Sequence, residues 1–451
     1  MVVNGEPTLL GPITSVGSIF LGPLYYYFIT PFLLLFNFDP VGPAIFIVIL
    51  SLATIYLLYL ISNEYFSFPA FVFSAILYTT SPLVLIHSRF SWNPNAVPFF
   101  ALLCIYGLLK VVIDKKDKWL FIVGFSLGIL FQLHYITLML LPVVLAVLLL
   151  RKFKIELKFY ALLLFGIITT LSPFILFELR HQFVNTQTAF RFIIQRDGTG
   201  QTNISLRDFG KHLNDVFVRL FWRLVVVKNA EITKAFILSL FAGLFLWIRN
   251  LKKLKEIKSL YAIKVLLIWF LVSLFVYGLY QGTVYDYYFV PLFPLPFLLT
   301  GIFFAMLWKR RLLGKIISTS LLVLFVFFHF ESIPFQYAAN NQVEQTKQIV
   351  QFVLKKTEGK PYNFALIADK NSDHAYRYFL EVLGYDPVAI ENPDIDPDRE
   401  TVTDQLLVVC EEKVCKPLGH PLWQIAGFGR AEIENEWELG VVRIFKLVPF
   451  E

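Results

Sequence analysis

Polar side chains that could do chemistry gather in a few short segments of an otherwise apolar chain. They are His87, Arg89, Asn93 and Asn95, then Gln132 and His134, then Glu178, Arg180 and His181, and finally Tyr285 and Asp286. Arg89 and His134 are of the types that bind phosphate, because cationic donors hold an anion more strongly beside a low-dielectric region than in water. The pattern therefore predicts an anion-binding cavity that contains Arg89 and His134.

The elements that must position these residues are long and apolar. Hydrophobic residues make up 57% of the chain and charged residues only 16%, against about 25% charged in an ordinary soluble domain. A helix needs about 20 mostly apolar residues to cross a bilayer. Such segments lie at residues 41–62, 68–88, 95–113, 119–132, 134–150, 159–178, 232–249, 261–280, 285–308 and 313–330. They predict an all-α polytopic membrane protein with about ten transmembrane helices, the short segments 119–132 and 134–150 forming a hairpin.

Lysine and arginine residues cluster between alternate pairs of these segments. The clusters run from Lys110 to Lys118, from Arg151 to Lys158, from Arg249 to Lys258 and from Lys309 to Lys315. The positive-inside rule makes their side cytoplasmic. The loop 179–231 and everything after residue 330 are then expected on the extracytoplasmic side of the plasma membrane.

The same topology puts the polar segment ends together on the outer face. Any one of these residues alone is more often a helix cap or an interfacial anchor than part of a site. Their joint placement on one side favours a shared cavity. Substrates that are half lipid and half water-soluble would reach such a cavity.

Residues 1–40 are expected to form a juxtamembrane segment on the outer face. The aromatic, proline-interrupted stretch from Leu21 to Pro31 favours an interfacial helix, because tyrosine is enriched at the headgroup level. An eleventh span over residues 20–36 is the alternative. By the same parity, an N-terminal helix that precedes this stretch is expected to be missing from the chain.

The extracytoplasmic segments have patterns of their own. Apolar residues recur at helical spacing in 179–231, which predicts two amphipathic helices on the membrane surface with a turn at 196–200. The region 331–451 holds 20 acidic and 12 basic residues. Mixed helical and strand-like patterns predict a small α/β domain there. The helices are expected at 343–356 and 373–383, and the strands at 363–368, 405–410 and 440–447.

Two features of this domain bear on metal and redox chemistry. The acidic stretch 394–400 is interpreted as a solvated loop rather than a cation site. Cys410 and Cys415 either form a short disulfide or stay unpaired. No spacing indicates zinc and no required cofactor can be read, although a role for a divalent cation stays open.

Several segments resemble the membrane glycosyltransferases of the GT-C superfamily, in particular the family 39 group related to protein O-mannosyltransferases and lipid A aminoarabinose transferases. The similar stretches lie at residues 22–27, 81–100, 124–142 and 285–291. They cover most of residues 20–300 in the family's order, and no single motif is decisive. The resemblance implies a GT-C-like helical bundle that transfers a sugar from a polyprenyl-phosphate-linked donor to an extracytoplasmic lipid, glycan or protein.

The resemblance also implies roles for particular residues. In such chemistry a carboxylate acts as general base on the acceptor hydroxyl, and cationic groups stabilise the departing lipid phosphate. Arg89 matches the family's arginine by position, and His134 stands where many members have a lysine, so both are expected at the donor together with Tyr135. The residues expected to line the substrate cavity are Asn93, Gln132, Asp286 and Tyr288.

The family's catalytic aspartate lies in a first outer loop that has no counterpart in this sequence. Glu6 and Asp39 are the nearby carboxylates and are the weak candidates for its role. The chain is therefore expected to be either N-terminally truncated or a noncatalytic relative.

Two other classes of function stay open. One is a transporter or flippase of lipid-linked saccharides, although no inverted repeat is visible and the spans hold almost no ionisable residue. The other is a noncatalytic membrane scaffold. Nucleic acid is not an expected partner, because membrane topology accounts for the excess of lysine and arginine.

Overall fold

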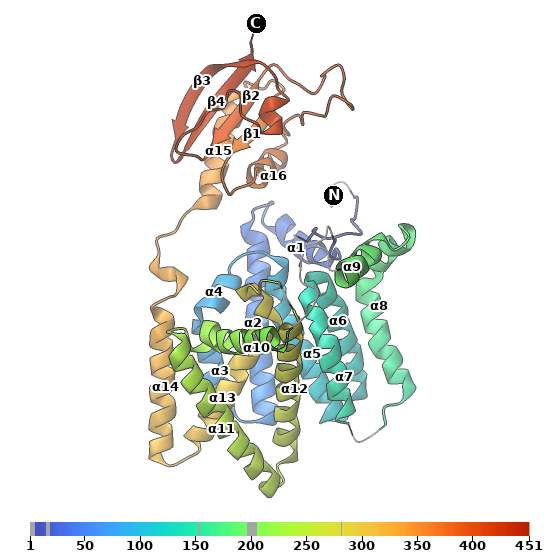
Figure 1. Ribbon diagram of the computed structural model, residues 1–451, viewed down its shortest axis with the longest axis vertical. Helices are drawn as coiled ribbons and strands as arrows, with labels where there is room; N and C mark the ends of the chain where they lie inside the picture. The colour runs from blue at the N-terminus through green and yellow to red at the C-terminus, as the bar shows by residue number, and fades with distance from the viewer. Residues whose placement is uncertain (1–4, 15–18, 152–153, 196–204, 281, 451) are drawn as a thin grey trace. The chain divides into compact units, whose positions relative to one another are not determined.

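The computed structural model describes residues 5–14, 19–151, 154–195, 205–280 and 282–450. The chain divides into two compact units, Met1–Tyr337 and Ala338–Glu451. The first unit consists of helices, and the second is built on a β-sheet (Figure 1). Each unit has its own apolar core.

Every apolar segment predicted to span the membrane contains a helix. These helices are α2 (Val41–Tyr65), α3 (Phe68–Thr80), α4 (Pro82–His87), α5 (Val97–Val112), α6 (Leu120–Leu133), α7 (Leu140–Leu149), α8 (Leu157–Arg180), α11 (Ala230–Leu254), α12 (Ile257–Leu279), α13 (Pro294–Trp308) and α14 (Leu312–Phe330). The predicted break between α6 and α7 falls at His134, which is extended. The predicted segment 68–88 is two helices instead of one, because Ser81 adopts the extended conformation favoured before a proline.

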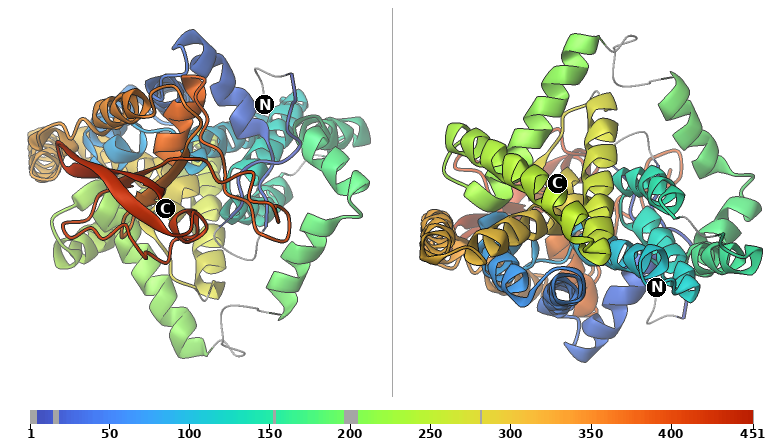
Figure 2. Two further views of the ribbon diagram at one scale, coloured as in Figure 1. Left: turned by 90° about the horizontal axis from the view of Figure 1, so that it is seen from above. Right: turned by 90° about the horizontal axis from the view of Figure 1, so that it is seen from below.

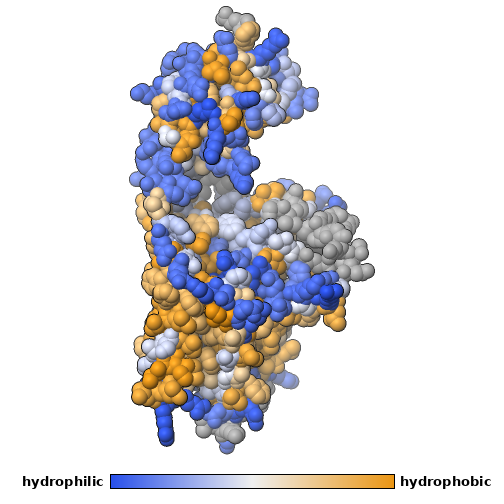
Figure 3. Space-filling model, turned by 60° about the vertical axis from the view of Figure 1, so that its left-hand side comes forward, coloured by the Kyte–Doolittle hydropathy of each residue, from blue (hydrophilic) through white to orange (hydrophobic). Residues whose placement is uncertain are grey.

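Six helices in the described part of the chain are long and apolar enough to cross a membrane. A seventh span results if η5 (Asp286–Leu292) and α13, bent by 60° at their junction, are counted together. One face of the first unit carries a broad apolar surface with hydrophilic residues beyond both ends (Figure 3). The chain is therefore a multi-pass membrane protein, whereas the predicted number of about ten spans is not confirmed.

The N-terminal helix α1 (Leu24–Leu35) has 12 residues. At 1.5 Å per residue it is about 18 Å long, which is too short for a hydrocarbon core of about 30 Å. A hairpin-like segment precedes it, in which Gly11 and Leu21 pair through the backbone. The short helix favours the interfacial interpretation over an eleventh span, and its depth in the membrane stays a prediction.

Helices α6 and α8 pack against each other through glycines. An added Cβ atom at Gly124 would lie 2.0 Å from the carbonyl oxygen of Leu163, and one at Gly166 would lie 2.5 Å from that of Phe121. Small residues let helix backbones approach this closely in membranes. Because α8 and α9 lie at one edge of the bundle, drawn in green in Figure 2, this contact is the main attachment of α8.

Substituting Gly124 by alanine is expected to destabilise the first unit by about 1–3 kcal/mol, because the new methyl group forces the two backbones apart. Thermal denaturation of the purified protein in detergent, followed by tryptophan fluorescence, measures the effect. Gly210→Ala is the matched control. A Cβ at helical Gly210 meets nothing within 4 Å, so this variant should be slightly more stable than the parent. Equal melting temperatures for the two variants would contradict the proposed contact.

A buried ionic cluster joins α2 to α5 and the residues just after it. Lys110 is almost fully buried, and its ammonium group pairs with Glu64 and, at 3.2 Å, with Asp114. The Tyr106 hydroxyl donates to Glu64 at 2.8 Å, and that of Tyr65 donates to Asp114 at 3.0 Å. Each carboxylate therefore has both a cation and a hydroxyl donor.

The predicted amphipathic helices in residues 179–231 are α9 (Val184–Gln195) and α10 (Leu206–Phe221). The predicted turn at 196–200 lies outside the described residues. Val216, Leu220 and Phe221 bury one side of α10 in the core of the bundle. The chain continues from α10 into a π-helical turn, η4 (Trp222–Val226), and then into α11.

The second unit is a four-stranded sheet with the strand order β1-β2-β4-β3. The strands are β1 (Asn363–Ile367), β2 (Leu406–Cys410), β3 (Ala431–Leu439) and β4 (Val442–Pro449). β1 and β2 are parallel, and β4 is antiparallel to both of its neighbours. Helices α15 (Gln342–Lys356) and α16 (His374–Val382) share an apolar core with one face of the sheet. The predicted small α/β domain is confirmed.

The edge strand β3 is missing from the prediction. Glutamates occupy alternate positions in it, at 432, 434, 436 and 438. Apolar residues stand between them at 431, 433, 437 and 439, so the alternation of a strand is present in the sequence and only Asn435 interrupts it. β3 forms by pairing with β4, with an irregularity between Ile433 and Asn435. Lys446 of β4 pairs with Glu434 at 2.8 Å and compensates part of this charge.

The other face of the sheet is covered by the short helix α17 (Trp423–Ala426) and by loops. Cys410 and Cys415 form a disulfide there, which decides between the two predicted states. In the acidic stretch, the side chain and backbone N–H of Thr401 and the N–H of Glu400 donate to Asp396. These hydrogen bonds lower the pKa of Asp396 below its usual value. The Asp396 carboxylate thus accepts hydrogen bonds from its own loop, in agreement with the interpretation of this stretch as a solvated loop.

Candidate functional site

Four rings from three distant segments meet in the first unit. The ring centroids of Trp92 and Tyr287 are 4.7 Å apart, and those of Tyr287 and Tyr288 are 4.6 Å apart. The His134 ring lies 6.0 Å from that of Tyr287 and 5.5 Å from that of Tyr288. We call these four residues the aromatic cluster. It brings together the predicted polar segments around residues 87–95, 132–134 and 285–288.

His134 lies between α6 and η3 (Tyr135–Met139), with φ of −167°. Its Nδ1 accepts a hydrogen bond from the backbone N–H of Ile136 at 3.1 Å. A ring nitrogen that accepts a hydrogen bond carries no proton, so the imidazole is neutral and bears its proton on Nε2. His134 is therefore available as a hydrogen-bond donor, and its ring geometry does not fit the cation that the sequence suggests.

Asp286 begins η5 and faces two arginines. The Nε of Arg223 lies 2.7 Å from its Oδ2, and the Nε of Arg219 lies 4.0 Å from its Oδ1. The Nη2 of Arg219 also donates to the carbonyl of Val284 at 2.8 Å, and its guanidinium lies over the ring of Phe289. We call Arg219, Arg223 and Asp286 the arginine–aspartate site. It adjoins the aromatic cluster, because Tyr287 and Tyr288 follow Asp286 directly.

The arginine–aspartate site has unused hydrogen-bonding capacity. Among the described residues, Arg219 has a buried Nε without a hydrogen-bond partner. A second carboxylate, Asp215, lies 3.1 Å from Arg219 on the exposed side of α10, where an ion pair contributes little. A compact anion that displaced the Asp286 carboxylate would gain both guanidinium groups as donors.

Arg219 and Arg223 are functional candidates that the sequence analysis missed. They are four residues apart, and such residues face the same way on a helix. The signal was available in the spacing, but only the apolar positions of this amphipathic segment were considered. The carboxylate they bind, Asp286, was predicted as a cavity residue.

The π-helical turn η4, which carries Arg223, is held by hydrogen bonds from neighbouring segments. The hydroxyl of Ser81 donates to the carbonyl of Leu224 at 2.8 Å, and the Nε2 of His329 lies 2.7 Å from the carbonyl oxygen of Val225. The Nδ1 of His329 is 2.8 Å from the hydroxyl of Thr80. Ser81 at the end of α3 and His329 in α14 thus fix the backbone that carries Arg223.

Arg89 lies apart from His134. It is exposed, and its guanidinium carbon lies 4.7 Å from the ring centroid of Phe335, beyond the end of α14. Among the described residues, Arg89 and His134 share no hydrogen bond, ion pair or ring contact. The structure therefore does not join the two residues that the sequence pattern pairs at a phosphate.

The other predicted residues near His134 hold the surrounding backbone. The Tyr135 hydroxyl donates to the carbonyl of Phe20 and accepts from the side chain of Asn185 at 3.2 Å. The Asn93 side chain donates to the carbonyl of Leu133. The Gln132 amide donates to the carbonyl oxygens of Gly128 at 3.0 Å and Thr170 at 2.7 Å. The bonds of Tyr135 and Asn93 fix the backbone around the aromatic cluster, and that of Gln132 to Thr170 joins α6 to α8.

The two predicted carboxylate candidates lie at the N-terminal side of the bundle. Glu6 is exposed. The Oδ1 of Asp39 accepts the backbone N–H of Val41 at 2.9 Å, at the start of α2. Among the described residues, no group of three or more His, Cys, Asp or Glu side chains is arranged to hold a metal ion.

Comparison with known proteins finds a family match for the N-terminal part of the chain. Residues 21–177 match the family described as dolichyl-phosphate-mannose-protein mannosyltransferase. No curated protein matches the sequence significantly.

Two solved structures share the fold. They are crystal structures of ArnT from Cupriavidus metallidurans, one bound to undecaprenyl phosphate, with a TM-score of 0.60, and one in the apo state, with a TM-score of 0.59. Each is 10% identical to this chain, and each comparison covers 99% of this chain and 91% of that chain. At this identity the likeness establishes the fold. The chain thus has the fold of ArnT, and its residues 21–177 resemble the mannosyltransferase family, in agreement with the resemblance seen in the sequence.

Proposed function

We propose that this chain transfers a sugar from a polyprenyl-phosphate-linked donor to an acceptor on the extracytoplasmic side of the plasma membrane. The observation that carries the proposal is the arginine–aspartate site beside the aromatic cluster. Guanidinium groups suit a phosphate, and ring faces offer apolar contact area to a sugar. The binding of undecaprenyl phosphate by ArnT, which shares the fold, supports a lipid phosphate as the ligand.

In this proposal Arg219 and Arg223 bind the donor phosphate in exchange for the carboxylate of Asp286. The Nε2–H of His134 supplies a neutral donor from the opposite segment. Arg89 is retained as a donor-binding residue on its family position alone. Tyr288 acts through its ring in the aromatic cluster, whereas Tyr135, Asn93 and Gln132 act by fixing the surrounding backbone.

The transfer forms one bond and breaks one. The acceptor hydroxyl oxygen bonds to the anomeric carbon while the bond between that carbon and the phosphate oxygen breaks. The hydroxyl proton passes to a carboxylate base, for which Glu6 and Asp39 are the candidates in this chain. The lipid phosphate leaves with the bonding electron pair, and the two guanidinium groups stabilise its growing negative charge.

The proposal includes a topology. The basic clusters, such as 309–315, face the cytoplasm under the positive-inside rule. The segment 1–40, the loop 179–231 and the domain 331–451 are then extracytoplasmic. Cysteine-accessibility labelling of intact cells tests this arrangement, and finding 309–315 and the C-terminal domain on one side would contradict it.

The activity is tested with full-length protein in lipid nanodiscs. We expect release of free undecaprenyl phosphate from at least one member of a panel of undecaprenyl-phosphate-linked hexoses and pentoses. His134→Ala should lower the rate about tenfold, because it removes one neutral donor. Lys158→Ala, at an exposed site on α8, is the control and should leave the rate unchanged.

Two results would contradict the proposal. If no donor releases lipid phosphate while the protein moves the intact lipid-linked sugar between leaflets, the chain is a flippase. If the donors neither bind nor react, it is a noncatalytic scaffold.

A further inference from the structure

A groove in the second unit is separate from the site described above. It has a volume of about 650 Å³ and lies between residues 418–421, helix α17 and the adjoining ends of β3 and β4. Pockets that bind small molecules typically enclose about 300–1,000 Å³. The groove is thus large enough for a ligand of that size.

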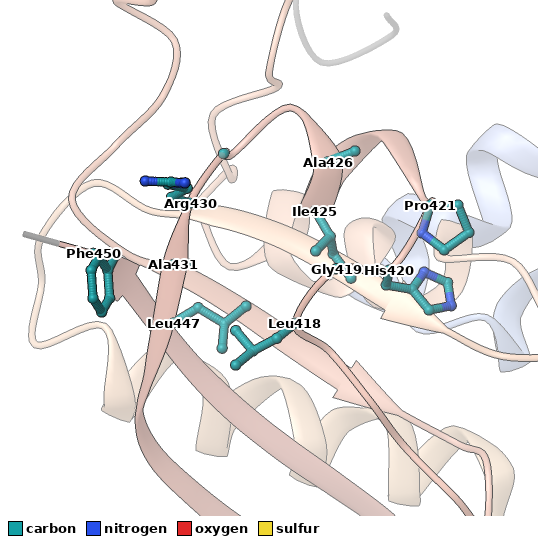
Figure 4. A pocket seen from close by; sticks show the side chains of 11 residues that line it. Leu418, Gly419, His420, Pro421, Ile425, Ala426, Arg430, Ala431, Leu447 and Phe450 are labelled. Carbon is teal, nitrogen blue, oxygen red and sulfur yellow. The ribbon is translucent and has the colours of Figure 1, made fainter.

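The groove is apolar along its length and polar at its ends (Figure 4). Leu418, Ile425 and Leu447 line its middle. Arg430 and Phe450 lie at one end, and His420 and Pro421 lie at the other. Leu447 and Ile425 are buried and belong to the core on this face of the sheet. The floor of the groove is therefore the edge of this core, and the exposed side chains of Leu418 and Phe450 supply the apolar surface that a ligand could contact.

The charge in the groove is opposite to that of its surroundings. Residues 331–451 carry 20 acidic and 12 basic side chains, yet among the residues that the structure describes no carboxylate lines the groove and Arg430 does. A second guanidinium is close to this end, because Arg399 donates to the carbonyl oxygens of Gly427 and Phe428 at 2.9 Å each. A Cβ atom at Gly429 would lie 3.0 Å from the same Arg399 side chain. An anionic group is favoured at this end.

We propose that this groove binds an amphiphile with one acyl chain and one anionic headgroup. The chain lies over Leu418, Ile425 and Leu447, and the headgroup pairs with Arg430. An extended peptide would need hydrogen-bond partners along its backbone. A single chain fits better, because His420 and Arg430 supply the only polar side chains among the described residues of the lining. This proposal does not depend on sugar transfer by the first unit.

The test uses the full-length protein in nanodiscs and palmitate that carries a diazirine on its chain. After irradiation, mass spectrometry identifies the labelled peptides, so lipid bound around the spanning helices is distinguished from lipid in the groove. We expect labels within residues 418–431 and 447–450. The matching diazirine-bearing alcohol, which lacks the carboxylate, should label these residues about tenfold less, since it loses the charged hydrogen bond to Arg430.

Variants locate the ligand. Leu418→Glu and Ala426→Trp should each lower groove labelling at least about tenfold, the first by placing a charge against the chain and the second by filling the space. Leu383→Glu is the matched control, because Leu383 is 45% exposed at the end of α16 and Leu418 is 46% exposed. Arg430→Gln should reduce labelling by the acid to the level of the alcohol.

Three outcomes would overturn the proposal. In the first, labels appear only in the first unit. In the second, groove labelling is the same in Leu418→Glu, Ala426→Trp and the parent protein. In the third, an acidic peptide with the same photoreactive group labels residues 418–431 more strongly than palmitate does, which would assign the groove to a peptide.

Discussion

Replacing Arg219 by glutamine is expected to slow the release of undecaprenyl phosphate about 100-fold, because the variant loses a preorganised cation where charge develops in the transition state. Arg223→Gln should have a similar effect. The rate of lipid phosphate release in nanodiscs measures both. Arg219 also donates to the carbonyl of Val284, so its replacement can disturb the fold. The side chain of Arg223 is 45% exposed, so Arg223→Gln separates loss of activity from loss of folding.

The control for these variants is Arg207→Gln, which removes an exposed arginine from the first turn of α10. Its turnover should equal that of the parent. Asp286→Asn adds a second check, because it removes the carboxylate that competes for the arginines and should therefore increase the affinity for undecaprenyl phosphate. Weaker binding in Asp286→Asn, or equal rates in Arg207→Gln and Arg223→Gln, would remove the arginine–aspartate site from the proposed mechanism.

Lys110→Met is expected to destabilise the first unit by about 1–3 kcal/mol, because it removes the buried cation that pairs with the partly exposed Glu64 and with Asp114. The loss should be visible as a large drop in the thermal midpoint in detergent. The variant keeps a long apolar side chain, so the change isolates the charge. Combining Lys110→Met with Glu64→Gln should recover part of the stability, since one of the two carboxylates that have lost Lys110 is then neutral.

Lys158→Met provides the comparison for Lys110→Met. Lys158 also pairs with a glutamate, Glu156 at 2.6 Å, but both side chains are about two-thirds exposed. An exposed pair is worth about 0–1 kcal/mol, so the midpoint should hardly move. Similar losses in the two variants would mean that burial does not govern the strength of these ion pairs.

The helical part of the fold could be predicted because the membrane imposes a length on apolar segments. Each of the predicted segments contains a helix, and the break at His134 lies where two short helices were expected. Periodicity could not reveal the bend between η5 and α13, because both parts are apolar and the change of direction depends on packing. β3 is a different case, since its glutamates alternate with mostly apolar residues and the strand could have been predicted from this pattern.

The site could be predicted in part. Sequence order placed His134, Asp286 and Tyr288 in the same region, and the structure brings His134 close to Tyr288. The state of the His134 ring depends on a hydrogen bond to the Ile136 amide, which no sequence pattern encodes. Arg223 bonds Asp286 across 63 positions of the chain, and no local sequence pattern encodes such a contact.

The acidic edge strand has a consequence for crowded membranes. An uncovered strand edge invites a second sheet to add to it, and natural proteins discourage this with charge and irregular pairing. β3 has both, in its alternating glutamates and in the irregularity between Ile433 and Asn435. Two copies that met edge to edge would bring like charges into register, so many molecules can share one membrane at neutral pH without their domains polymerising into a continuous sheet.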